Sequence, residues 1–137
     1  MPIEIERKFT VNEIPKTITN SFVIEQFYML IDKDFVQRLR IFDNKKAIAT
    51  ARVRQKEENI LKIERVAVLF EFRRLKVGST LIKNIIQYFT NLNENIFFIL
   101  HSQVAVADFY ESINFISYGD EFFEDGIPHI AMKYVKN

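Results

Sequence analysis

The feature that most constrains the fold is a change in hydrophobic period at about residue 80. Before it, apolar and polar residues alternate, most clearly over residues 3–9 and 35–42, with the period of a strand that has one buried face. After it, one helical face collects a set of apolar residues: Leu81, Ile82, Ile85, Ile86 and Phe89. We therefore predict strands first and strand–helix–strand units later, in an α/β or α+β protein with a mixed central sheet and flanking helices.

This pattern assigns most of the chain to strands, helices or loops. The expected strands are residues 3–9, 22–31, 35–42, 47–54, 61–70, 96–100, 115–118 and 129–135, and the expected loops are 12–20, 55–59 and 120–128. Two helices are expected. One begins at Gly78 and ends at residues 91–95, and the other covers residues 104–113.

Composition excludes several classes of protein. At 137 residues with 48% hydrophobic residues, the chain has enough apolar material for a core of ordinary size, so we assign residues 1–137 to a single domain. It contains no cysteine, which excludes disulfides, thiolate nucleophiles and cysteine zinc sites. The net charge of +1 favours neither a nucleic acid nor a membrane as partner. The charged N-terminus and the absence of an apolar run of roughly 20 residues predict a cytoplasmic protein.

The segment with the clearest chemical signal is ERVAVLFEFRRLKVGSTLI, residues 64–82. A β-branched strand leads into a loop with Arg73, Arg74 and Lys76, and Gly78 then begins the amphipathic helix. The first N–H groups of a helix have no internal partner, and the helix dipole adds partial positive charge there. This arrangement suits a pyrophosphate, because Gly78 allows close approach and the basic side chains add charge-assisted donors. From these residues alone, a solvated basic turn is the alternative.

Several segments, in the order found here, resemble the GNAT acetyltransferases over about residues 36–137. The acetyl-CoA motif of that family is R/Q-x-x-G-x-G/A, and its three fixed positions hold Arg73, Lys76 and Gly78, so a lysine replaces the first glycine. Downstream, HSQVAVADFYESINF resembles the second CoA-binding segment, with Gln103 where many members have asparagine and with Phe109 and Tyr110 matching its Phe-Tyr pair. The final FFEDGIPHIAMKY is similar to the YjcF-like or ElaA-like branch in particular.

The resemblance implies the GNAT acyl-CoA N-acyltransferase fold, with acetyl-CoA as cosubstrate, a primary amine as acceptor and no metal. It places a set of residues on the cosubstrate: Val66, Ala67, Val68, Arg73, Arg74, Lys76, Val77, Gly78, Ser79 and Gln103. In such enzymes a backbone amide of the strand polarises the acetyl oxygen, and here that amide would lie near Val66 to Val68. The Cβ of Lys76 would crowd the approach of the phosphates. Exposed edge strands could also pair in a homodimer.

Two residues are candidates for acid–base catalysis. Tyr110 matches the tyrosine that protonates the departing thiolate in this family, and its ordinary pKa of roughly 10 leaves it protonated at neutral pH. Core packing beside its aromatic neighbour is the alternative. Glu64 is the candidate general base, directly or through water, with Arg65 expected on the opposite face of the strand. A solvated or ion-paired glutamate is the alternative.

The two histidines carry weaker signals. A single histidine before a strand is usually structural, so a catalytic or acceptor-binding role for His129 is secondary to that. His101 is expected to pack or to make a hydrogen bond at the end of a strand. Their separation does not predict a zinc site.

The first forty residues fit the GNAT resemblance poorly, because that family normally has two helices where the pattern here predicts strands. They resemble the start of a CYTH, or triphosphate-tunnel, domain instead. Glu4, Glu6 and Lys8 match its E-x-E-x-K motif, and residues 26–28 and 38–40 match its next strands. Residues 1–40 are then an atypical, CYTH-derived segment or plain additional strands. In a further alternative, residues 22–26 correspond to the YjcF-like branch and no CYTH piece exists.

Three hypotheses about function follow. The first is an N-acetyltransferase that uses acetyl-CoA. The second is a module that binds CoA or a phosphorylated ligand without turnover. The third is a remnant of a metal-dependent, triphosphate-binding CYTH protein.

Overall fold

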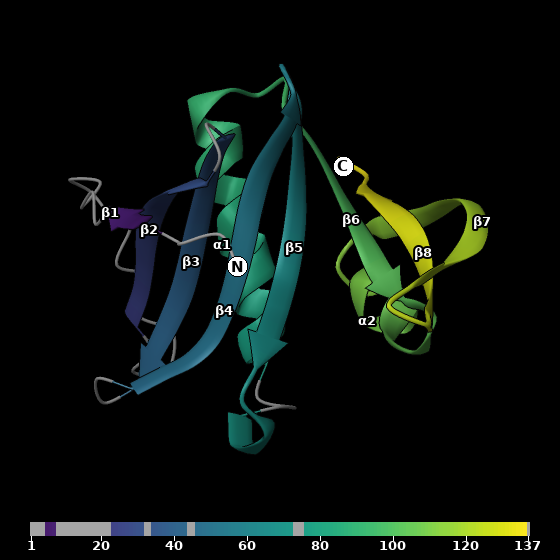
Figure 1. Ribbon diagram of the computed structural model, residues 1–137, viewed down its shortest axis with the longest axis horizontal. Coiled ribbons are helices and arrows are strands. Elements are labelled where there is room, and N and C mark those ends of the chain that lie inside the picture. The colour runs from purple at the N-terminus through teal and green to yellow at the C-terminus, as the bar shows by residue number, and fades with distance from the viewer. Residues whose placement is uncertain (1–4, 8–22, 32–33, 44–45, 73–75, 137) are drawn as a thin grey trace.

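The computed structural model describes residues 5–7, 23–31, 34–43, 46–72 and 76–136. These residues form one mixed sheet, in the strand order β1-β2-β3-β4-β5-β6-β8-β7, with helices packed on it (Figure 1). The strands are β1 Ile5–Arg7, β2 Val23–Ile31, β3 Asp34–Asp43, β4 Lys46–Glu57, β5 Ile60–Val68, β6 Phe97–Gln103, β7 Phe115–Glu124 and β8 Ile127–Tyr134. The α-helices are α1 Val77–Leu92 and α2 Ala107–Glu111, and short 3-10 turns lie at Phe70–Phe72 and Val104–Val106. The predicted mixed sheet with flanking helices is confirmed.

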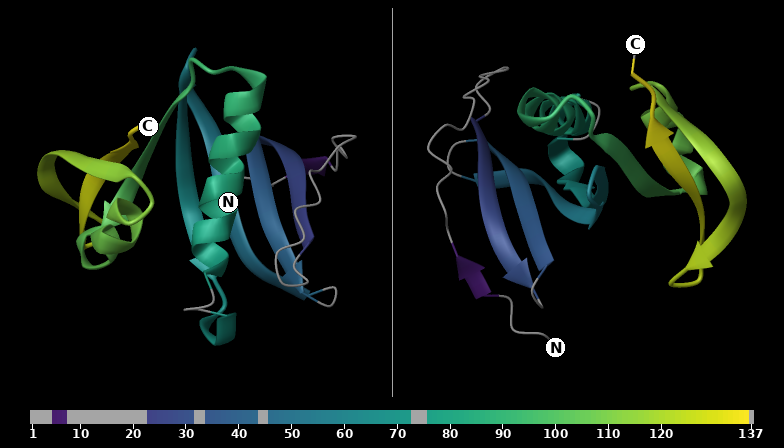
Figure 2. Two further views of the ribbon diagram at one scale, coloured as in Figure 1. Left: turned by 180° about the vertical axis from the view of Figure 1, so that it is seen from behind. Right: turned by 90° about the horizontal axis from the view of Figure 1, so that it is seen from above.

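The strands β5 and β6 divide the sheet into two arms. They are the one parallel pair among the described strands, and they pair only over Ile60–Ile63 and Phe97–Leu100. A parallel pair needs a crossover connection, and α1 supplies it across one face of β3, β4 and β5 (Figure 2). We call β1 to β5 the first arm, and β6, β8, β7 and α2 the second arm, which turns away from the first (Figure 1).

The core of the first arm lies between its sheet and α1. The sheet contributes a set of buried residues: Ile41, Ile48, Ala49, Ala51, Val53, Leu61 and Ile63. The helix contributes the apolar face that its period predicted: Val77, Leu81, Ile82, Ile85, Ile86 and Phe89. Each such side chain contributes about 1.5–3 kcal/mol when fully buried, so packing holds α1 in place. The second arm adds further residues to the same hydrophobic core: Phe98, Leu100, Tyr110, Ile113, Phe115 and Met132.

Two predicted loops are largely strands. Residues 55–59 were expected to form a charged turn, but β4 continues through Glu57. Residues 120–128 were expected to form an acidic loop, but β7 continues through Glu124 and β8 begins at Ile127. Asp125 and Gly126 alone make the turn, with φ angles of 52° and 76°. Asp-Gly is a strong hairpin signal, because both residues tolerate positive φ, and the acidic composition concealed it.

The described part of the first 43 residues consists of strands β1, β2 and β3. A strand-rich segment therefore precedes β4, as the pattern predicted. The loop expected at residues 12–20 lies outside the described residues, as do Glu4 and Lys8 of the CYTH comparison. None of the described helices is both long enough and apolar enough to cross a membrane.

Candidate functional site

A cleft opens where the two arms separate. Beyond Ile63 and Leu100 the facing edges of β5 and β6 diverge, and a cavity of about 1240 Å³ lies there. The cavity brings together every predicted site residue that the structure describes: Glu64, Val66, Ala67, Val68, Lys76, Val77, Gly78, Ser79, Gln103 and Tyr110. Arg73 and Arg74 lie outside the described residues.

A bulge in β5 shapes the first wall of the cleft. Between two successive pairs of the β4–β5 ladder, β5 has one residue more than β4, and Arg65 there has a φ of 52°. Ile63 and Val66 both pack toward the core, so Glu64 and Arg65 lie between two inward residues and both line the cavity. The simple alternation that placed Arg65 opposite Glu64 is therefore wrong, because a bulge interrupts the two-residue period.

The start of α1 presents backbone donors to the cleft. The first helical hydrogen bond runs from the N–H of Thr80 to the carbonyl of Lys76, at 2.9 Å. The N–H groups of Val77, Gly78 and Ser79 precede this bond and have no partner within the helix. All three residues line the cavity together with Lys76. N–H groups arranged in this way suit an anion, and the anion site itself stays a prediction.

Lys76 and Gly78 differ in how well they suit this turn. Lys76 is left-handed, with φ 60° and ψ 20°, a conformation that glycine adopts freely and lysine adopts at a cost. A Cβ added to Gly78 would lie 3.3 Å from Cζ of Phe109 and 3.4 Å from Cγ2 of Val68. A larger residue at Gly78 would therefore have to displace a side chain of the cleft.

Tyr110 is both a packing residue and a donor that lines the cleft. Its ring packs edge to face against Phe109 and Phe115, with centroids 5.0 and 5.8 Å away. Burial raises the pKa of Tyr110 from 10.0 to about 12. The Tyr110 hydroxyl makes no hydrogen bond to any residue that the structure describes. The packing role weighed as the alternative is thus real, and the hydroxyl remains a protonated donor at neutral pH.

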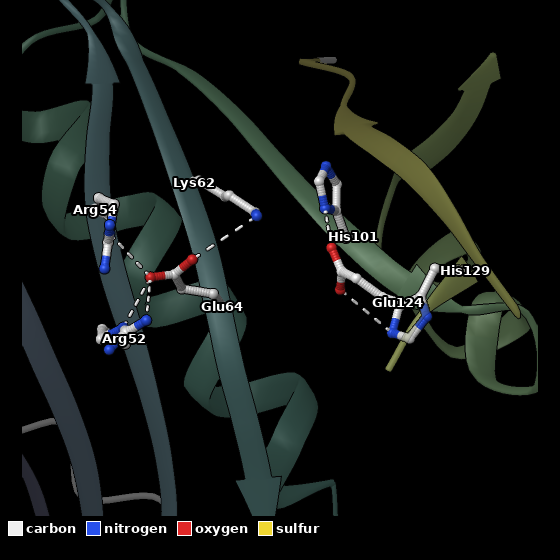
Figure 3. Close-up of polar contacts among 7 residues, drawn as sticks. All are labelled: Arg52, Arg54, Lys62, Glu64, His101, Glu124 and His129. Atoms are coloured by element: carbon white, nitrogen blue, oxygen red, sulfur yellow. Dashed lines mark hydrogen bonds and ion pairs between the residues drawn. The ribbon is translucent and has the colours of Figure 1, made fainter. Parts of the chain in front are cut away.

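Glu64 lies in a cluster of basic side chains (Figure 3). Arg52 contacts Oε1 of Glu64 through both Nε and Nη2, each at 2.7 Å. Arg54 Nε lies 3.2 Å from the same oxygen, yet at an angle that makes no hydrogen bond, so this buried donor is unsatisfied within the described structure. Lys62 Nζ lies 3.8 Å from Oε2. The ion-paired alternative for Glu64 is therefore what the structure shows, with Oε2 the less occupied oxygen.

A second cluster joins His101 of β6, Glu124 of β7 and His129 of β8 (Figure 3). His101 Nδ1 lies 2.9 Å from Glu124 Oε1, and His129 Nε2 lies 3.6 Å from Glu124 Oε2. His129 Nδ1 lies 2.7 Å from the carbonyl of Ile127, so Nδ1 carries the proton and neutral His129 keeps its lone pair on Nε2. The hydrogen bond from His101 is the main cause that lowers the pKa of Glu124, and the charges of His101, His129 and Lys62 add to it.

Sequence reasoning took the two histidines singly and missed Glu124, which it placed in a loop. The Asp125–Gly126 turn could have found it, because a two-residue hairpin sets Glu124 opposite Ile127 and near His129. Among the described residues, no three histidine, aspartate or glutamate side chains are placed to hold a metal ion.

Both clusters lie on the sheet face opposite α1. On β5, Leu61 and Ile63 are buried toward α1, so Lys62 and Glu64 point the other way. On β6 the buried residues are likewise the alternate ones, and His101 lies between them. Figure 3 shows the Glu64 cluster on the first arm and the Glu124 cluster on the second, with Lys62 extending toward His101.

A family model described as an acetyltransferase (GNAT) domain matches residues 7–136. Protein ElaA of Escherichia coli K12 is 31% identical over 119 residues, which cover 81% of this chain and 78% of ElaA. Two Bacillus subtilis proteins are 29% and 26% identical over 96 residues. This chain spans 64% of the length of each of those two relatives.

Solved structures agree with the family match. The crystal structure of Escherichia coli ElaA superposes with a TM-score of 0.66 at 27% identity, covering 73% of this chain and 68% of that one. A GNAT family acetyltransferase from Elizabethkingia anophelis, solved with acetyl-CoA bound, superposes with a TM-score of 0.59 at 15% identity and shares the fold. It covers 72% of this chain and 75% of that one. Because the family model begins at residue 7, it takes in most of the segment compared with a CYTH domain, and that comparison gains no support.

Proposed function

The chain belongs to the GNAT acetyltransferase family, and we propose that it transfers an acetyl group from acetyl-CoA to a primary amine by direct attack. One observation carries the proposal. The strands β5 and β6 part beside the free N–H groups at the start of α1, and the cavity between them reaches a protonated Tyr110. The cleft thus offers an anion site, an extended channel and an acid, which are the parts that acetyl transfer from a thioester needs.

Acetyl-CoA is proposed to enter along β5. Its pyrophosphate would accept hydrogen bonds from the N–H groups of Val77, Gly78 and Ser79, with Lys76, Arg73 and Arg74 adding positive charge. Its pantetheine arm would lie between β5 and β6 where the two strands diverge. The residues that line the cavity there are Val66, Ala67 and Val68 of β5 and Gln103 of β6. An amide of the bulged stretch would donate to the acetyl oxygen as negative charge develops there.

Tyr110 is proposed to protonate the departing thiolate. A cysteine-like thiol has a pKa of roughly 8.5, so a phenol whose pKa is about 12 is protonated whenever the thiolate forms. The tyrosine regains its proton from solvent after the product leaves. Tyr110→Phe removes the donor and keeps the ring packing against Phe109 and Phe115.

The amine must lose a proton as it attacks, and two groups on the sheet face opposite α1 are candidates. Glu64 could accept this proton at Oε2, because Arg52 contacts the other oxygen, Oε1. His129 could accept it at Nε2, because Nδ1 is held by the carbonyl of Ile127. Glu64→Gln and His129→Gln separate the two, since only loss of the true acceptor removes the low-pH limb of the rate profile.

A thermal-shift titration with CoA and acetyl-CoA tests the proposal first. A ligand at 100 times its Kd adds roughly 2.7 kcal/mol of stability, so the melting temperature should rise clearly. No shift with either compound would refute the proposed function. Thiol release with a panel of primary amines then tests turnover, and Tyr110→Phe should lower kcat roughly 10²–10⁴-fold. If Tyr110→Phe retains the full rate, the tyrosine is not the acid.

The left-handed Lys76 supports a second candidate, which is CoA binding without turnover. A lysine where the family has glycine brings a Cβ toward the site proposed for the phosphates. A protein that is stabilised by CoA and releases no thiol with any amine would support this candidate over transfer.

The assembly is also proposed. We infer one domain over residues 1–137 and a homodimer formed at the edge strand β7. This strand ends the sheet and exposes Ile116, Tyr118 and Phe123, which are 47%, 40% and 76% accessible. Light scattering on the purified protein tests it, and a monomer at all concentrations would refute the dimer.

A further inference from the structure

The two walls of the cleft carry opposite charge. On the first arm and α1, the described ionisable residues that line the cavity are Arg52, Lys62, Arg65, Lys76, Lys83 and a single acid, Glu64. On the second arm they are two acids, Glu124 and Asp125, and two histidines, without lysine or arginine. The cleft therefore offers a positive surface and an acidic surface that face each other.

The positive wall has spare capacity for an anion near Glu64. Three basic side chains share that one carboxylate, which leaves two positive charges in excess. One donor that lines the cavity is incompletely used, because Lys62 Nζ is 3.8 Å from its partner. The side chains of Arg52 and Lys62 are 11% and 16% exposed, so solvent screens them weakly.

The acidic wall suits an ammonium or an attacking amine. Glu124 is held ionised by its hydrogen bond with His101, and it contacts His129 as well. Lys62 extends toward His101, the hydrogen-bond partner of Glu124 (Figure 3). The two walls line one cavity, so a molecule in that cavity can contact both.

We propose that the acetyl acceptor is a small amine that carries its own carboxylate, such as an amino acid. Its carboxylate would bind Lys62 and Arg52, and its amine would lie beside Glu124 and His129. This rests on the proposed acetyl transfer and adds the class of acceptor. The bound ammonium first releases one proton to solvent. The amine nitrogen then bonds to the acetyl carbon and the carbon–sulfur bond breaks. The proton that the nitrogen loses in this step passes to His129, beside which the amine lies, and the thiolate takes a proton from Tyr110.

Charge separates this acceptor from the main alternatives. A polyamine would place several positive charges against a wall that already has two in excess near Glu64. A simple alkylamine would leave that excess uncompensated. An amino acid compensates both walls at once, because a carboxylate meets Lys62 and an ammonium meets Glu124.

Matched ligand pairs test the proposal on CoA-saturated protein by thermal shift and titration calorimetry. The pairs are glycine with glycinamide and L-phenylalanine with phenethylamine, and spermidine is added as the polyamine. At least one amino acid should bind, roughly tenfold or more tighter than its partner without the carboxylate, which is about 1.4 kcal/mol. Equal or tighter binding of the amide, the simple amine or spermidine would overturn the proposal, and so would an absence of binding by both amino acids.

Variants locate the effect. Lys62→Gln should abolish the preference for the carboxylate, whereas Lys56→Gln, at an exposed position of β4 outside the cavity, should retain it. The CoA-induced thermal shift shows whether Lys62→Gln is folded. If that shift is lost, Lys62→Met serves as a second variant. A preference that survives both Lys62 variants overturns the assignment. If the unsubstituted protein shows no CoA-induced shift, the proposed function itself is refuted, so the two failures are distinguishable.

Discussion

At the scale of single residues, the cleft depends on one backbone conformation and one buried tyrosine. Lys76 holds a left-handed turn at the start of α1, and burial raises the pKa of Tyr110 to about 12. Both properties come from the surroundings of the residue. Each can be changed by a substitution that leaves the rest of the cleft in place.

Tyr110 should make stability fall at high pH. Its pKa is about 12 in the folded protein and about 10 when exposed, so the unfolded chain loses this proton first and unfolding is favoured as pH rises from 10 to 12. The loss approaches about 2–3 kcal/mol relative to Tyr110→Phe. Urea unfolding of both proteins from pH 8 to 12 measures it. Parallel stability curves would show that burial does not raise the pKa.

Lys76→Gly should stabilise the protein. A non-glycine residue in the left-handed region costs about 1–2 kcal/mol, and the greater freedom of glycine in the unfolded chain offsets about half of that. We expect a gain of up to about 1 kcal/mol in the free energy of unfolding. Lys76→Ala is the matched control, because it removes the charge and retains the Cβ, and it should give no gain. An equal gain in both variants would assign the effect to charge.

At the scale of helices and strands, the hydrophobic period predicted those elements whose buried faces are fixed by packing. The helix α1 and the strand β5 appeared where their apolar residues repeat, since burial against each other fixes their faces. The bulge at Arg65 arises from pairing with β4, and its own residues carry no signal for it. Glu124 escaped prediction because β7 is an edge strand with weak alternation. The candidate site was therefore predictable along β5 and α1, and not on the acidic wall.

Ile85→Ala should destabilise α1 strongly. Ile85 is fully buried between the helix and the sheet, and truncation of such a residue costs about 2–5 kcal/mol through lost burial and a cavity. Gln87 lies on the exposed face of the same helix, so Gln87→Ala should change stability by less than about 0.5 kcal/mol. Denaturant unfolding of both variants gives the comparison. A small effect at Ile85 would mean that the core relaxes around it.

At the scale of the whole molecule, the two arms share one continuous hydrophobic core and one short parallel ladder. The first arm packs on α1, the second packs its aromatic rings on each other, and the ladder of β5 and β6 joins them. The positive wall of the cavity therefore lies on one unit and the acidic wall on the other. Small changes in the angle between the arms would alter the width of the cleft.

The short ladder has a consequence for the exchange of backbone hydrogens with solvent. Past Ile63, the ladder between β5 and β6 ends, so the N–H groups of residues 64–67 that point toward β6 have no partner on that described strand. These N–H groups should exchange with deuterated solvent much faster than those of residues 61–63. A cofactor bound between β5 and β6 should slow the exchange of these N–H groups selectively, because it can accept their hydrogen bonds as a neighbouring strand does. Hydrogen-exchange mass spectrometry with and without CoA measures this, and equal protection of both stretches would contradict it.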